Sequence, residues 1–84
     1  MDLNLTYLKF FYDAALRQSL VESAKINFVS QPAVSQGIRR LEQSLGIELL
    51  IHRKNHFALT EQGKVVFSEA RKVFESLDEI IQAV

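Results

Sequence analysis

A short stretch of amide, hydroxyl and guanidinium side chains carries most of the chemistry that this chain offers. Gln31, Ser35, Gln36 and Arg39 recur at spacings that place them on one side of a helix, and that side has no carboxylate. Amides and hydroxyls can hydrogen-bond to the edges of bases, and a guanidinium can bind phosphate. The stretch therefore has the chemistry of a surface that reads nucleic acid. An ordinary amphipathic surface helix is the alternative at this point.

A second polar stretch lies further along the chain. The residues Arg53-Lys54-Asn55-His56 are bracketed by Leu49-Leu50-Ile51-His52 and by Phe57-Ala58-Leu59. This pattern predicts a small two-stranded hairpin with a basic tip. His52 and His56 are four residues apart, but no cysteine or acidic third ligand is near them in the sequence, so we expect no metal site.

The charges of the chain are unevenly distributed, although they cancel overall. Residues 25–56 carry five basic and two acidic side chains, which gives this segment a charge of +3. The segments before and after it carry −1 and −2. A basic middle segment in a neutral chain fits a domain that binds DNA through that segment.

Length and composition limit the other classes of function. The chain has 84 residues, of which 48% are apolar, enough for one small domain. It contains no cysteine. The sequence shows neither a nucleophile with a matching base nor a glycine-rich phosphate loop, so we expect no enzyme and no cofactor. Because no apolar run is long enough to cross a bilayer and no signal pattern is present, we expect a cytoplasmic protein without a membrane partner.

Three short helices are predicted to position the polar stretch. Asn4 is the expected N-cap of a helix from about Leu5 to Arg17. Ser19-Leu20-Val21-Glu22 reads as a capping box that opens a second helix, which ends near Ile26. The core-facing residues expected from the first helix are Leu8, Phe11, Tyr12 and Ala15.

The third helix is the one that carries the polar stretch. Ser30 is its expected N-cap, Pro32 is tolerated in its first turn, and Gly46 ends it after Leu45. A turn of Asn27-Phe28-Val29 separates it from the second helix. Two short helices joined in this way, the second with a polar outer face, form a helix-turn-helix. A basic hairpin attached to such a unit is called a wing.

A long final helix is predicted after the hairpin. Thr60 is its expected cap, and the helix should extend for about 24 residues. Apolar residues recur along it at alternating steps of four and three, which is a heptad seam, and we expect a second copy of the chain to pack on it. The seam consists of Val66, Ala70, Val73, Leu77, Ile80 and Val84.

The predicted fold is mainly α: a winged helix-turn-helix of three helices plus a small two-stranded wing, followed by a long C-terminal dimerisation helix. The winged domain covers residues 1–60 and the linker or dimerisation helix covers residues 61–84. The predicted function is binding of operator DNA as a dimer, through a recognition helix of about 31–44 and a wing of about 52–57. The alternative is a helical dimerisation or protein-interaction module that does not bind DNA.

The order of the motifs resembles the N-terminal domain of LysR-type transcriptional regulators. The resemblance covers essentially the whole chain without gaps. It is carried by Leu8-Lys9-Phe10-Phe11, Ser30-Gln31-Pro32-Ala33-Val34-Ser35, Ile38-Arg39-Arg40-Leu41-Glu42, Leu45-Gly46, Leu49-Leu50, and Leu59-Thr60-Glu61 with Gly63. Members of the family continue into an effector-binding domain, so the resemblance implies a fragment of a longer regulator, with a small-molecule effector and a higher oligomer only in that longer protein.

The resemblance also implies roles for individual residues. The recognition helix should approach bases, and Arg39 and the wing should meet the DNA backbone and the minor groove. The residues expected to contact double-stranded DNA are Gln31, Pro32, Ser35, Gln36, Arg39, Arg40, His52, Arg53 and Lys54. The chain departs from the family at several positions. Asn27 replaces the core leucine before the turn, Ser23-Ala24 replaces paired alanines, Gln36 stands where arginine is frequent, and His52 aligns with the usual arginine of the wing.

Overall fold

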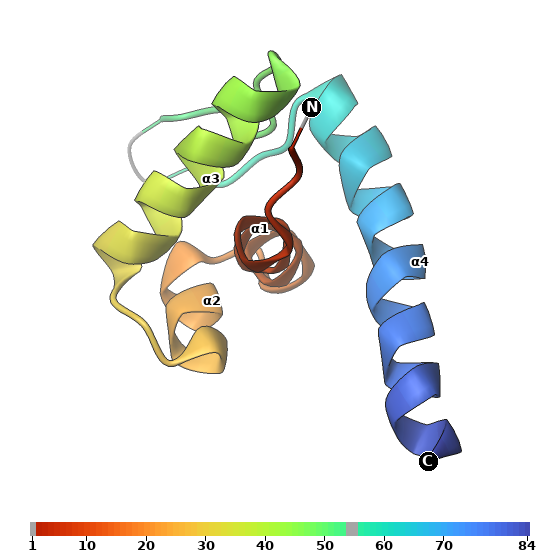
Figure 1. Ribbon diagram of the computed structural model, residues 1–84. Helices are drawn as coiled ribbons and strands as arrows, with labels where there is room; N and C mark the ends of the chain where they lie inside the picture. The colour runs from red at the N-terminus through yellow and green to blue at the C-terminus, as the bar shows by residue number, and fades with distance from the viewer. Residues whose placement is uncertain (1, 54–55) are drawn as a thin grey trace.

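The described part of the chain forms four helices. The computed structural model describes residues 2–53 and 56–84. The helices are α1 (Leu5–Arg17), α2 (Leu20–Asn27), α3 (Gln31–Leu45) and α4 (Glu61–Ala83). Figure 1 looks along α1, which lies between α2 and α3 on one side and α4 on the other. The predicted mainly helical fold, with a winged helix-turn-helix and a long C-terminal helix, is confirmed.

Each helix begins at its predicted N-cap. The side-chain oxygens of Asn4, Ser19, Ser30 and Thr60 each accept a hydrogen bond from the backbone N–H three residues later. Such a bond satisfies one of the backbone N–H groups that a helix leaves without a partner in its first turn. The start of α3 is therefore fixed by a local interaction, and the orientation of the polar face of this helix depends on it.

The predicted capping box of α2 is only half formed. Ser19 accepts from the Glu22 N–H at 3.1 Å, as expected. The return bond is replaced, because the Ser19 N–H donates to the carbonyl of Ala14 at 3.0 Å. The Glu22 carboxylate instead lies 3.4 Å from the Lys25 ammonium. Because α2 follows α1 closely, the Ser19 N–H, which in a capping box would donate to the glutamate side chain, donates to a carbonyl of α1 instead.

The hydrophobic core lies where α1 meets the other helices and the base of the wing. Its largest fully buried apolar side chains are Phe11, Val34, Ile38, Leu41 and Leu49. The expected core residues of α1 are in place, with Leu8, Phe11 and Ala15 buried and Tyr12 packed against the core. Because α3 buries one apolar stripe, its opposite face remains available to solvent.

Gly37 allows α1 and α3 to approach closely. A Cβ atom at this position would lie 2.8 Å from ring carbons of both Tyr7 and Phe10. Phe10 is itself buried, so its ring has little room to move. The glycine in the recognition helix is therefore required by packing, despite its low helix propensity.

The wing is an antiparallel hairpin at the predicted position. Two isolated bridges pair Leu50 with Leu59 and Arg53 with His56, and the Ile51 N–H donates to the Ala58 carbonyl at 2.9 Å. The pairing is too short to form regular strands in the described residues. The predicted contact residue Lys54, together with Asn55, lies outside the described residues.

The base of the wing is closed by the start of α4. The Thr60 hydroxyl donates to the Glu48 carbonyl at 2.6 Å, and the Thr60 N–H donates to the Leu49 carbonyl at 3.0 Å. A Cβ atom at Gly63 would collide with that same Leu49 carbonyl. The threonine and the glycine of the Leu59-Thr60-Glu61-x-Gly63 motif therefore both serve the contact between wing and helix.

Helix α4 packs on α1 through aromatic side chains. The Tyr12 ring stacks on Phe67, with centroids 5.4 Å apart, and lies against Phe74 at 5.3 Å. Beyond this contact the helix continues away from the three-helix unit (Figure 1). In the described part of the chain, no helix is both long and apolar enough to cross a membrane.

Candidate nucleic-acid interface

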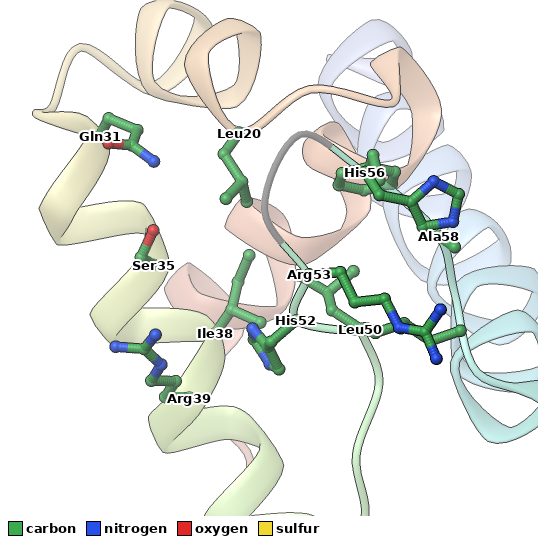
Figure 2. Close-up of a pocket in the computed structure, with 12 residues that line it drawn as sticks. Leu20, Gln31, Ser35, Ile38, Arg39, Leu50, His52, Arg53, His56 and Ala58 are labelled. Atoms are coloured by element: carbon green, nitrogen blue, oxygen red, sulfur yellow. The ribbon is translucent and has the colours of Figure 1, made fainter.

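A groove of about 340 Å³ separates the recognition helix from the wing. Its two polar sides are Gln31, Ser35 and Arg39 from α3, and His52, Arg53 and His56 from the wing. Figure 2 shows the three α3 side chains in a row along the helix. Its apolar lining includes Leu20, Ile38, Leu50 and Phe57. The structure thus brings together residues that the sequence analysis had identified on two separate elements.

The α3 side of the groove continues onto the exposed face of the helix. Gln31, Pro32, Gln36 and Arg39 are exposed, and Ser35 is half-buried. The N-cap bond from Ser30 fixes the first turn, at the end of the helix where the backbone dipole favours an anion. This face presents amide donors and acceptors with a neighbouring cation on a rigid support.

The groove is electropositive. Arg39 on α3 and Arg53 on the wing line it from opposite sides, and both are exposed. Neither aspartate nor glutamate occurs among the described residues that line it. A polyanion that enters the groove therefore meets two guanidinium groups without a carboxylate that would repel it.

One carboxylate that does not line the groove, that of Glu42 on α3, binds the wing to this helix. Glu42 Oε2 accepts the backbone N–H of Leu49 at 2.8 Å and that of Leu50 at 3.2 Å. Glu42 Oε1 lies 3.1 Å from Nε2 of His52. The sequence analysis gave Glu42 no structural role beyond its place in the Ile38–Glu42 motif, because two of its partners are backbone groups that no side-chain pattern shows.

Comparison with known proteins agrees with this geometry. The family profile described as "Bacterial regulatory helix-turn-helix protein, lysR family" matches residues 5–64, which is most of the chain. The chain belongs to the LysR family. One relative, the uncharacterized HTH-type transcriptional regulator YoaU of Bacillus subtilis (strain 168), is 40% identical over 74 residues, which cover 87% of this chain and 26% of that protein.

Solved structures of LysR-family domains have the same fold. A complex titled BenM_DBD/catB site 1 DNA superposes with a TM-score of 0.88 at 27% identity, covering 96% of this chain and 91% of that one. Vibrio fischeri DarR in complex with DNA superposes with a TM-score of 0.85 at 29% identity, covering 99% of this chain and 28% of that one. The chain spans about a quarter of the length of the curated relatives it matches.

Not every predicted contact residue of this LysR-family domain lies at the groove. Arg40 lies on another side of α3, where it lines a shallow depression with Asp2, Tyr7 and Gln43. His56 also lines the groove, although the sequence analysis, which placed it in the wing of about 52–57, did not name it among the expected contact residues. Its place in a basic hairpin tip was the signal that could have added it to the interface.

The predicted apolar seam of α4 is divided by the structure. Val66 packs against the core and Ala70 is 2% exposed, so both are covered by the chain itself. Four seam residues remain exposed, and these are Val73, Leu77, Ile80 and Val84. A second chain could therefore use only the C-terminal part of the seam that sequence analysis proposed.

Proposed function

We propose that this chain binds double-stranded DNA in a sequence-specific manner, as the DNA-binding domain of a longer transcriptional regulator. One observation carries the proposal: the row of Gln31, Ser35 and Arg39 on α3 faces a basic wing across an electropositive groove. The DNA complexes of two family members with the same fold support it. The role is binding in the cytoplasm rather than catalysis.

The geometry suggests how the duplex would be seated. An α-helix fits the major groove of B-DNA, where each base pair presents a distinct pattern of donors and acceptors. With α3 in the major groove, the sugar-phosphate strand that separates the major from the minor groove would pass along the protein's groove, between Arg39 and Arg53. The wing would then reach the adjacent minor groove. Gln31 and Gln36 would then read bases, and the arginines would bind phosphates.

We also propose that two copies pair through α4. Val73 and Leu77 are each 38% exposed, and Ile80 is 62% exposed, in a stripe that the rest of the chain does not cover. A paired helix would bury this stripe and bring two recognition helices to two half-sites of one operator. In a longer chain this arrangement would link DNA binding to an effector-binding domain and to a higher oligomer.

The competing function is a helical interaction module that does not bind DNA. Such a module gives no reason for a carboxylate-free groove between α3 and the wing, with a guanidinium on each side. The family profile and the DNA complexes of relatives also favour DNA binding.

Selection from a pool of random duplexes tests the proposed function. The protein should enrich one short motif, arranged as an inverted repeat if α4 pairs two copies. It should bind the enriched duplex at least about 100-fold more tightly than a scrambled duplex of the same composition, a ratio below that of intact operator-binding dimers. Enrichment of no motif, or equal affinity for the enriched and the scrambled duplex, would refute sequence-specific binding by this chain.

A further inference from the structure

We infer that His52 is a positioning residue: it fixes the wing on the recognition helix through Glu42 and does not itself bind DNA. The inference rests on the proposed function and changes the role that sequence analysis assigned to His52. It concerns how the two DNA-contacting elements of this chain keep their relative position.

The Glu42 carboxylate accepts hydrogen bonds from three groups of the wing and its base. Its Oε2 accepts from the N–H groups of Leu49 and Leu50, at the base of the wing. Its Oε1 lies 3.1 Å from Nε2 of His52, two residues further along the chain than Leu50. Because an ionised carboxylate only accepts hydrogen bonds, His52 donates from Nε2.

This carboxylate is held firmly, whereas the histidine is more open to solvent. The Glu42 side chain is 11% exposed and that of His52 is 40% exposed. Leu49 and Leu50 are buried, so the wing base is also anchored by packing. Of the three donors, His52 is the one nearest the tip, and it can control the direction in which the tip leaves the base.

The position of His52 in the chain connects the direction of the wing tip to DNA binding. Arg53 follows it directly in the chain and lines the groove on the side opposite Arg39. Of the two ring nitrogens of His52, Nε2 is already engaged by Glu42 on α3, which directs the ring toward that helix. The pair therefore sets the separation between the reading face of α3 and the cation of the wing.

His56 provides a matched control within the same hairpin. It is exposed, lines the same groove and pairs by its backbone with Arg53. If wing histidines act by binding phosphate, both should contribute in the same way. If His52 acts through Glu42, the two histidines should differ.

The test is a double-mutant cycle on the selected operator duplex. We expect His52→Ala to weaken binding by roughly 3- to 10-fold in a protein that retains Arg53, because the pair no longer holds the wing. In an Arg53→Ala background the same replacement should change affinity by less than about twofold, since the guanidinium next to His52 that the pair positions is gone. Equal losses in both backgrounds would overturn the inference.

A measurement without DNA tests the same contact. In the free protein, His52→Ala should accelerate amide hydrogen exchange at Ile51, whose N–H bonds to Ala58 across the hairpin, whereas His56→Ala should leave it within about twofold. Unchanged exchange in His52→Ala would overturn the inference. Absence of operator binding by the unmodified protein would instead overturn the proposed function, and the exchange experiment would still report on the His52–Glu42 contact.

Discussion

Asn27 Nδ2 lies 3.0 Å from Asp13 Oδ2, and this hydrogen bond joins the last residue of α2 to the middle of α1. Asp13 is buried and also binds the Lys9 ammonium at 2.6 Å. The Asn27 amide donates further to the Ser23 carbonyl at 2.8 Å, and the Ser23 hydroxyl donates to the Phe10 carbonyl at 2.8 Å. Polar residues thus hold α2 in place where the family resemblance led us to expect a leucine.

Replacing Asp13 with alanine tests the importance of this polar junction. The substitution removes a buried acceptor of two hydrogen bonds, one of them from an ammonium, so we expect it to lower the free energy of unfolding by about 1–3 kcal/mol. Chemical denaturation followed by circular dichroism measures the change. The control is Glu69→Ala, which breaks the exposed pair with Lys72 and should change stability by less than about 0.5 kcal/mol. Similar small effects in both variants would show that the junction contributes little.

Gly63→Ala tests the contact between α4 and the wing. The added methyl group would collide with the Leu49 carbonyl, a backbone atom that cannot rotate away, so we expect a loss of about 3 kcal/mol or an unfolded chain. The thermal midpoint measures it. For comparison, Gly46→Ala has open space around its Cβ and strains only its backbone φ of 71°, for about 1 kcal/mol. If the alanine at 63 is tolerated as well as that at 46, the wing is not packed as described.

The exposed part of the α4 seam predicts self-association. The double substitution Leu77→Asp and Ile80→Asp places charge on exposed positions that the rest of the chain does not cover, so it should leave the fold intact and give a monomer. Sedimentation at tens of micromolar should show the unmodified chain as a dimer. In contrast, Ala70→Asp should unfold the domain, because Ala70 is buried in the core of the single chain. A monomeric unmodified chain would contradict the proposed pairing.

Local signals explain why the helices could be predicted well from sequence. Asn4, Ser19, Ser30 and Thr60 act as caps through bonds to residues three positions away, and such bonds depend on neighbouring residues alone. Gly46 ends α3 in the left-handed conformation for the same kind of reason. The row of polar residues on α3 follows directly from helical spacing.

The features that sequence did not predict depend on contacts between distant parts of the chain. The bonds of Glu42 to backbone groups of the wing, the bond of Asn27 to Asp13, and the burial of Ala70 each require the packed fold. The role of Gly37 belongs to the same group, since only the approach of α1 shows that a side chain at this position would meet Tyr7 and Phe10.

The division of work between α3 and the wing is the central claim, and one set of titrations tests it most directly. Unmodified protein, Gln31→Ala and Arg53→Ala are titrated against the selected operator and a scrambled duplex across a salt series. Gln31→Ala should reduce the preference for operator by about 1–3 kcal/mol per bound subunit and leave the salt slope unchanged, because an amide reads a base. Arg53→Ala should weaken binding to both duplexes and reduce the slope by about one unit per subunit, because a guanidinium displaces counterions from phosphate. If Gln31→Ala leaves the preference for operator intact, α3 is not the element that reads the sequence, and the proposed seating of the duplex is wrong.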